Sequence, residues 1–190
     1  MSAGIIGAFL SGLLCLLAFA IVGWAVLTYN RLTRLRNQTQ ASWAQIDVQL
    51  KRRHDLIPNL VETVRGYAAH ERGTLDAVVA ARNGAIGATE PANVAAAENA
   101  LTQTLGRLFA LAEAYPDLKA NQNFAALQAE LAATEDKIAY ARQFYNSAVQ
   151  SLNTSVQTLP TNVIAGVGGF RPADYFQTAD DERGPVQVRF

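Results

Sequence analysis

Apolar residues follow four patterns along the chain, and the first is an uncharged run at the N-terminus. No charged side chain occurs from Met1 to Asn30, and Ile5 to Leu27 is almost wholly apolar. At about 1.5 Å per residue, a helix over this run spans a hydrocarbon core of about 30 Å. No Lys or Arg precedes the run and no cleavage site follows it, which argues against a cleaved signal peptide. We therefore expect a retained transmembrane anchor over residues 1–30.

The second pattern begins at Trp43 and reads WAQIDVQLKRRHDLIPNLVETVRGY. Its apolar and aromatic residues recur at intervals of three, four and seven, which places them on one stripe of an α-helix. Pro58 removes a backbone hydrogen bond inside this pattern and predicts a kink nearby. Because no Pro or Gly separates Tyr29 from Trp43, the membrane helix is expected to continue into this one. The stripe consists of Trp43, Ile46, Leu50, Ile57, Leu60, Val64 and Tyr67.

The helical pattern that begins at Trp43 fades by Gly84 to Glu90. Two further amphipathic patterns follow it. One runs from Pro91 to about Tyr115, and the other from about Asn121 to about Leu159. The last is the most regular and is typical of coiled-coil packing. Their stripes are Leu101, Leu105, Leu108, Phe109, Ala112 and Tyr115, and then Phe124, Leu127, Leu131, Thr134, Ile138, Ala141, Tyr145, Ala148, Leu152, Ser155 and Leu159.

Together these patterns predict an all-α protein, an N-terminal transmembrane helix that continues into an antiparallel bundle of long helices. Residues 31–170 form the bundle, and residues 171–190 a C-terminal tail that either docks as a short strand or stays loose. Pro160 ends the last long helix, and Ile164 to Phe170 is expected to form a glycine-rich apolar turn.

Arginines after the anchor predict its orientation. Arg31, Arg34 and Arg36 follow the apolar run, whereas no basic side chain precedes it. Such a bias places the C-terminal side of a single-pass protein in the cytoplasm, with a few N-terminal residues outside. Trp24 and Tyr29 fit the aromatic belt at the same inner interface. These five residues are our predicted membrane-interface set.

Small residues also recur within the anchor. Gly4, Ala8 and Gly12 are spaced four apart, a pattern that allows two helix backbones to approach closely in lipid. We interpret them as a candidate transmembrane association face, with the alternative that small residues are simply common in membrane helices.

Charge and cysteine content exclude some classes of function. Sixteen basic and sixteen acidic residues cancel, and the pI is near 6.7. A general nucleic-acid binder usually carries a basic footprint, so no nucleic-acid partner is expected. The single cysteine, Cys15, has no intrachain partner for a disulfide or a cysteine-based zinc site.

Two histidines raise the question of a metal site. His70-Glu71 begins like a helical zinc motif, but no second His follows at the required spacing. His54 and His70 lie about 160° apart around a straight helix. A di-iron bundle needs Glu-x-x-His motifs, which the sequence lacks. We therefore predict no metal, cofactor or catalytic residue.

The remaining charges fit structural roles better than chemistry. The cluster Lys51 to His54 lies about 30 Å of helix beyond Asn30, too far for headgroup contact. We favour the interpretation that this cluster forms a solvated face or makes salt bridges. The acidic residues of the last helix, with Glu113, are expected to pair with neighbouring helices. An enzyme with an interhelical pocket near His54, Asp55 and Tyr67 is the least favoured alternative.

Several stretches resemble the LemA family of bacterial membrane proteins. The resemblance covers nearly the whole chain after the first membrane residues, and it implies a single N-terminal membrane helix with a cytoplasmic helical bundle. It brings no catalytic residues. The matching stretches are Tyr29-Asn30, Leu35 to Asn37, Trp43 to Glu71, Glu98 to Asn121 (ENALTQTLGRLFALAEAYPDLKAN), Thr134 to Asn146 (TEDKIAYARQFYN), Asn162 to Gly166 and Pro185 to Phe190.

These observations predict a non-enzymatic, membrane-anchored scaffold or adaptor of the bacterial inner membrane. It would contact the lipid bilayer, form homo-oligomers and bind envelope proteins. The family resemblance implies an alternative, a regulatory subunit of a membrane protease or transporter. A membrane metallopeptidase or another envelope protein would then be the partner.

Overall fold

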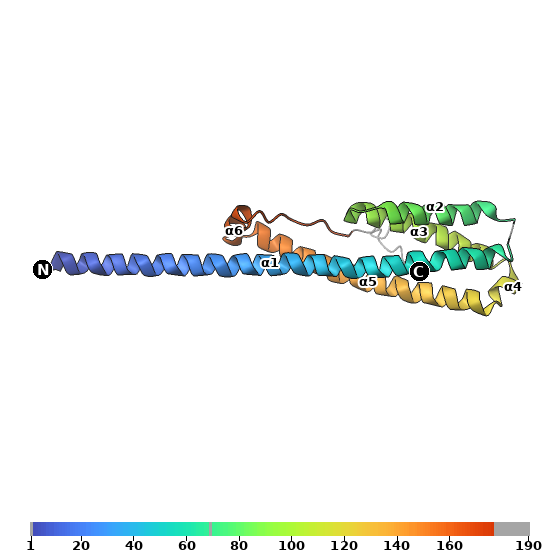
Figure 1. The fold of residues 1–190 in the computed structure, drawn as a ribbon, viewed down its shortest axis with the longest axis horizontal. Coiled ribbons are helices and arrows are strands. Elements are labelled where there is room, and N and C mark those ends of the chain that lie inside the picture. The colour runs from blue at the N-terminus through green and yellow to red at the C-terminus, as the bar shows by residue number, and fades with distance from the viewer. Residues whose placement is uncertain (1, 69, 177–190) are drawn as a thin grey trace, which may run out of the picture. The chain divides into compact units, whose positions relative to one another are not determined.

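The computed structural model describes residues 2–68 and 70–176, with side chains from residue 7 onward. Every regular element within these ranges is a helix, so the predicted all-α class is confirmed (Figure 1). The helices are α1 (Ser2–Arg65), α2 (Arg72–Gly87), α3 (Pro91–Ala112), α4 (Pro116–Lys119), α5 (Gln122–Gln157) and α6 (Thr161–Val167).

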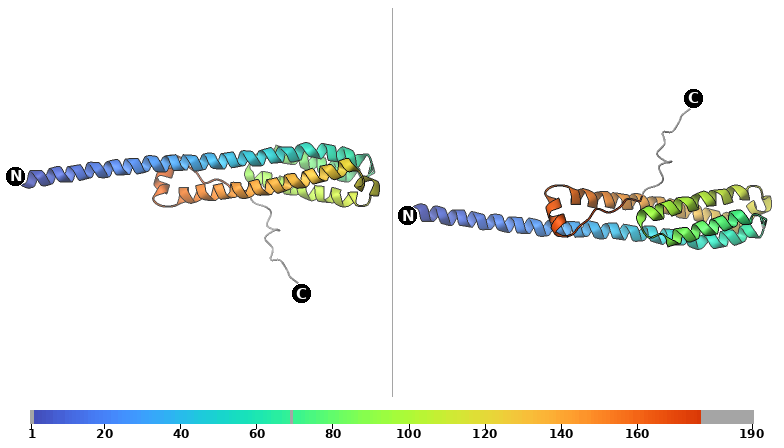
Figure 2. Two further views of the ribbon diagram at one scale, coloured as in Figure 1. Left: turned by 90° about the horizontal axis from the view of Figure 1, so that it is seen from below. Right: turned by 90° about the horizontal axis from the view of Figure 1, so that it is seen from above.

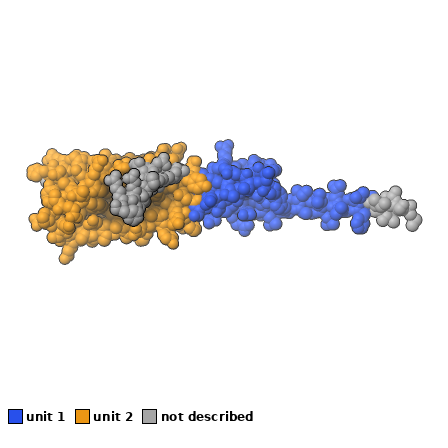
Figure 3. Space-filling view, turned by 180° about the vertical axis from the view of Figure 1, so that it is seen from behind, with its two compact units in different colours: residues 1–41, 147–173 blue, residues 42–146, 174–190 orange. Residues whose placement is uncertain are grey.

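The chain divides into two compact units, which Figure 3 colours separately. Unit 1 comprises residues 1–41 and 147–173, and unit 2 comprises residues 42–146 and 174–190. Helices α1 and α5 contribute residues to both units. The predicted division at residues 30 and 170 remains a prediction, and the part of the predicted tail from 177 to 190 lies outside the described residues.

Unit 2 is a bundle in which successive long helices run antiparallel (Figures 1 and 2). The stripe predicted on the first bundle helix points into its core: Ile46, Ile57, Leu60 and Val64 are fully buried and Leu50 is 5% exposed. Burial of such side chains is the main stabilising contribution to a fold of this kind. The cluster is completed from α2, α3, α4 and α5 by residues that include Leu75, Val78, Leu101, Leu105, Leu108, Leu118, Phe124 and Leu131.

The first bundle helix ends earlier than its hydrophobic pattern predicts. Helix α1 stops at Arg65, and the amides of Tyr67 and Ala68 both donate to the Val64 carbonyl. Gly66 directly follows, and glycine disfavours continuation of a helix. Tyr67 therefore lies in the turn, 44% exposed, rather than on the buried stripe.

The chain then reverses into α2, which buries Leu75, Val78 and Ala85. The sequence analysis did not separate this helix from the first. Helix α1 itself runs unbroken through Pro58. The kink predicted near that proline remains a prediction.

The fourth pattern, from about Asn121 to about Leu159, matches α5 closely. Phe124, Leu131, Thr134, Ile138 and Tyr145 are buried in unit 2, as the heptad spacing predicted. In unit 1 the same stripe continues through Ala148 and Leu152, which are also buried. Leu159 lies beyond the end of α5 and is 79% exposed, so the last predicted stripe position is wrong.

The expected glycine-rich turn is also partly wrong, because most of it is helical. Residues Thr161–Val167 form α6 in unit 1, and only Gly168 and Gly169 turn the chain. Gly169 has φ 69°, which favours glycine. A Cβ on Gly168 would lie 2.7 Å from the Phe170 ring. Glycine at both positions therefore lets Phe170 fold back into the unit 1 core.

Two asparagines on α5 bind the extended chain that follows α6. In unit 1, the side-chain amide of Asn153 donates to the Ala173 carbonyl at 2.9 Å and accepts from its amide at 2.8 Å. In unit 2, Asn146 makes the same paired hydrogen bonds with Phe176, at 3.0 and 2.9 Å. Each asparagine thus satisfies both backbone polar groups of one residue.

Replacing Asn146 with alanine should release the chain around Phe176 and destabilise unit 2 by about 1–2 kcal/mol, because two hydrogen bonds are lost. Phe176 packs against Trp43, with ring centroids 5.9 Å apart. Trp43 fluorescence should therefore shift to the red in a Trp24→Phe background. The exposed Asn59 is the matched control, and Asn59→Ala should leave the spectrum unchanged. An unshifted Asn146→Ala spectrum would contradict this role.

Candidate functional site

The predicted membrane-interface residues all lie on α1 within unit 1. Trp24 is 40% exposed and Tyr29 is 47% exposed. The Tyr29 ring meets Phe170 edge-on at 5.4 Å, and the Arg36 guanidinium lies over the same ring at 5.2 Å. Arg31, Arg34 and Arg36 are exposed. The structure therefore brings Tyr29 and Arg36 together on one aromatic side chain, which the sequence analysis had not linked to them.

The apolar segment before these residues is exposed along its described length. Helix α1 is the one helix among the described residues that is long and apolar enough to cross a membrane. Side chains such as Phe9, Leu14 and Phe19 are 70–80% exposed. A contiguous apolar surface of this kind is unfavourable in water and suits a lipid environment.

The predicted association face lies on this segment. Ala8 and Gly12 are exposed on α1, and a Cβ on Gly12 would meet nothing within 4 Å. Gly4 also lies in α1, but its surroundings fall outside the described side chains. Association through this face remains a prediction.

A group of charged and titratable side chains is buried inside unit 2. Glu98 on α3 is 5% exposed and lies between Arg53 and His54 of α1, which are 4% and 8% exposed. Arg53 Nη1 donates to Glu98 Oε2 at 3.0 Å, and His54 Nε2 lies 2.6 Å from Glu98 Oε1. Arg53 also donates to the Thr102 hydroxyl at 2.7 Å and lies 3.2 Å from Glu135. We call Arg53, His54 and Glu98 the buried charge cluster.

The basic stretch Lys51 to His54 thus splits between two environments. Lys51 pairs with Asp55 at 2.7 Å, and Arg52 pairs with Glu130 at 2.7 Å, both at the surface. The predicted salt bridges are confirmed for these residues and for Arg53. A solvated face is wrong for Arg53 and His54, because the helical repeat places them beside Ile57 and Leu50 rather than beside Lys51.

An open pocket of about 350 Å³ borders the buried charge cluster. Asp47, Lys51, His54 and Asp55 line it, so the structure does place His54 and Asp55 together. The hydrogen bond from Lys51 lowers the pKa of Asp55, whereas burial raises the pKa of Asp47. Tyr67 does not reach this pocket; its hydroxyl accepts a hydrogen bond from Asn121 at 2.9 Å.

The geometry of the buried charge cluster indicates a structural role. Each charged group of the cluster is paired, and Arg82 adds a hydrogen bond to the His54 carbonyl at 2.7 Å. Within the described ranges, no three His, Cys, Asp or Glu side chains gather in a way that would hold a metal ion. The cluster therefore crosslinks α1 to α3 through paired, desolvated charges.

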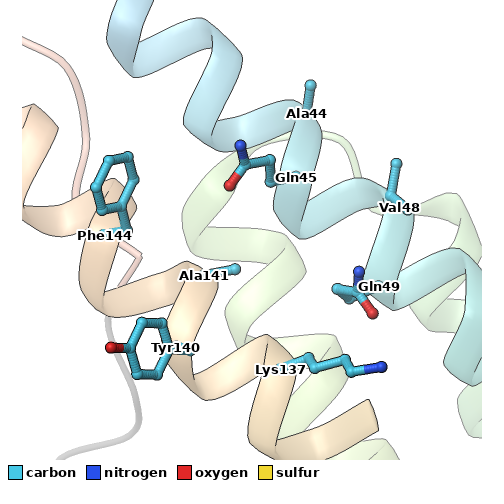
Figure 4. A pocket seen from close by; sticks show the side chains of 8 residues that line it. All are labelled: Ala44, Gln45, Val48, Gln49, Lys137, Tyr140, Ala141 and Phe144. Carbon is cyan, nitrogen blue, oxygen red and sulfur yellow. The ribbon is translucent and has the colours of Figure 1, made fainter.

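An open apolar groove with a volume of about 670 Å³ lies between α1 and α5 in unit 2 (Figure 4). Val48 is 63% exposed, Tyr140 78% and Phe144 51%. In Figure 4, Gln45 and Gln49 of α1 extend toward α5. The groove is lined by Ala44, Gln45, Val48, Gln49, Lys137, Tyr140, Ala141 and Phe144. We call these eight residues the α1/α5 groove.

One polar atom in the α1/α5 groove is unusual. Gln49 Oε1 is buried and has no hydrogen-bond partner among the described residues. A buried acceptor without a partner is unfavourable by about 1–3 kcal/mol.

Sequence reasoning missed both Glu98 and the α1/α5 groove. Glu98 occupies a buried heptad position, three residues before Leu101 and four after Val94, where an apolar residue is expected. A charged residue at a position where an apolar one is expected was the sequence feature that could have indicated this site. Tyr140 and Phe144 lie four apart on the face of α5 beside the predicted stripe, a spacing that marks a second apolar face.

Comparison with known proteins supports the reading of the fold. A family model described as the LemA family matches residues 42–190. The magnetosome protein MamQ 2 of Paramagnetospirillum magneticum is 27% identical over 184 residues, covering 83% of this chain and 68% of the relative. Protein LemA of Metamycoplasma hominis is 27% identical over 163 residues, covering 84% and 73%. These names state no catalytic activity.

The family model covers more than half of the chain, so the resemblance inferred from the sequence motifs is confirmed. The long helix α1 with its apolar start, and the helical packing of unit 2, agree with it. The chain belongs to the LemA family.

Proposed function

We propose that this protein is a non-enzymatic scaffold or adaptor, anchored in the bacterial inner membrane by α1, that self-associates and binds envelope proteins. The observation that carries the proposal is the α1/α5 groove, where large apolar side chains stand exposed on the bundle. Exposed apolar patches on an otherwise packed domain are typical of protein interaction sites. The family match and the names of the relatives point to no reaction, which is consistent with this role.

The groove has the composition of a helix-binding surface. Val48 and Phe144 offer apolar contacts, and Tyr140 offers both a ring and a hydroxyl, the type of residue enriched at interaction hot spots. An apolar helix from a second copy of the chain is the occupant that we assign to it.

Orientation follows from the arginines. Arg31, Arg34 and Arg36 are exposed on α1 directly after the apolar segment, as the inner-interface assignment requires. On this basis we assign units 1 and 2 beyond the membrane to the cytoplasm. Anchoring in one plane also raises the local concentration of copies and favours self-association.

Replacing Tyr140 with aspartate should weaken self-association by roughly 30-fold, the effect of losing about 2 kcal/mol at a hot spot. The measurement is chemical crosslinking of the full-length protein in membranes at native abundance. Tyr140 is 78% exposed, so the change should leave folding intact. Val79→Asp on α2, a half-exposed site away from the groove, is the matched control.

Loss of a self-crosslink in Tyr140→Asp but not in Val79→Asp supports the proposal. Equal crosslinking in wild type and both variants would show that the α1/α5 groove does not mediate self-association. A crosslink to one other protein, lost only in Tyr140→Asp, would favour an adaptor over a homomeric scaffold.

A further inference from the structure

Helix α6 packs against α1 just beyond the apolar segment. Leu32 is fully buried, and it forms one cluster in unit 1 with Ala165 of α6 and with Phe170. Leu32 lies five residues after Leu27, roughly 7 Å along the helix. A headgroup layer is roughly 5–8 Å thick on each side of the hydrocarbon core. The contact with Leu32 therefore places α6 at headgroup depth when α1 spans the membrane.

Three apolar side chains on and beside α6 do not pack into the unit 1 core. Val163 is 59% exposed and Val167 is 89% exposed, and they lie four residues apart on one face of the helix. Leu159, in the turn before α6, is 79% exposed. On the other face, Ala165 is 1% exposed. The helix is thus apolar on its outer face as well. It lies beside α1, just after the apolar segment (Figures 1 and 2).

Charge in unit 1 is all of one sign. Its two segments, residues 1–41 and 147–173, contain four arginines and no Asp or Glu. With sixteen basic and sixteen acidic residues in the whole chain, twelve basic and sixteen acidic residues remain in unit 2. A basic, acid-free surface at headgroup depth attracts anionic lipids. The arginines are Arg31, Arg34, Arg36 and Arg171.

We propose that α6 is an interfacial membrane-binding helix, and that Leu159, Val163 and Val167 insert into the headgroup region of an anionic bilayer. The proposal rests on the membrane anchoring of α1 proposed above. Apolar residues flanked by arginines are the recurrent chemistry of helices that lie in the membrane interface. Unit 1 would then contact the bilayer twice, through the spanning segment and through α6.

Spin labels on the full-length protein in bilayers that contain anionic lipid test this. In a Cys15→Ser background, single cysteines replace Val163 or Val167, and Ser151→Cys, exposed on α5 of unit 1, is the aqueous control. The readout is the ratio of accessibility to oxygen, which partitions into lipid, over that to a water-soluble nickel complex. We expect this ratio at Val163 and Val167 to exceed that at Ser151 several-fold. The excess should shrink in neutral lipid.

Wild-type Cys15, labelled alone, reports on the anchor itself. A lipid-exposed Cys15 with Val163 and Val167 as aqueous as Ser151 would overturn the α6 proposal and leave the anchor intact. An aqueous Cys15 would overturn both. Labels at Val163 and Val167 that are shielded from both reagents and broadened by spin–spin contact would show that a second copy, rather than lipid, covers α6, and would also overturn the proposal.

Discussion

Replacing Glu98 with alanine is expected to lower the free energy of unfolding by about 3 kcal/mol. The substitution leaves Arg53 and His54 buried without their shared carboxylate. A desolvated charge that loses its partner is far less favourable than the same charge in water. Glu135, 44% exposed, still lies 3.2 Å from Arg53 and should hold the effect near the lower end of the usual range. The measurement is urea unfolding of the full-length protein in detergent, followed by circular dichroism.

Glu130→Ala is the matched control, since it removes a carboxylate from a helix salt bridge of similar geometry at the surface. Glu130 and Arg52 are 42% and 49% exposed, so the loss should stay below about 1 kcal/mol. A double replacement, Arg53→Met with Glu98→Leu, should be milder than Glu98→Ala alone because the Arg53 guanidinium is no longer buried without Glu98. Equal destabilisation by Glu98→Ala and Glu130→Ala would contradict the role of the buried charge cluster.

Replacing Phe170 with alanine is expected to destabilise the packing of α6 by about 3 kcal/mol. The Phe170 ring is 6% exposed and is held by Leu32, Tyr29 and Arg36. Its removal leaves a cavity, while the aromatic and cation–π contacts are also lost. Because the opening is local, amide hydrogen exchange over α6 is the measurement. Exchange there should accelerate by roughly 100-fold, the equivalent of about 3 kcal/mol.

Ile86→Ala serves as the control for this change. Ile86 is 52% exposed on α2 in unit 2 and lies outside the α1/α5 groove, so its replacement should alter stability by less than about 0.5 kcal/mol and leave exchange in α6 unchanged. Unaltered exchange over α6 in Phe170→Ala would mean that α6 is held on α1 by something other than this ring.

The spacing of apolar residues in the sequence predicted the helices, because the residues that are buried set that spacing. Positions such as Ile46, Ile57 and Leu60 recur at helical spacing since one side of α1 faces the core of unit 2. The heptad pattern of α5 is equally clear in the sequence from Phe124 to Leu152. The candidate membrane-spanning segment was also evident in the sequence, because a long uncharged run has few other stable environments.

Other features depend on tertiary contacts that no local pattern encodes. Glycine alone did not mark the break after Arg65, because Gly66 follows the end of α1 whereas Gly73 lies inside α2. The sequence shows a charge at the heptad position of Glu98, but it does not show that Arg53 and His54 face that charge. Helix α6 contains Gly166 and β-branched residues with weak helical preference, and contact with Leu32 stabilises it.

The mass of the full-length protein, extracted at native abundance into a membrane mimic, tests the central claim most directly. Mass spectrometry of every co-purifying protein completes the measurement. A scaffold or adaptor predicts either a uniform homomeric assembly or a stoichiometric second protein, such as a membrane metallopeptidase or another envelope protein. A strictly monomeric chain with no stoichiometric partner would contradict the account.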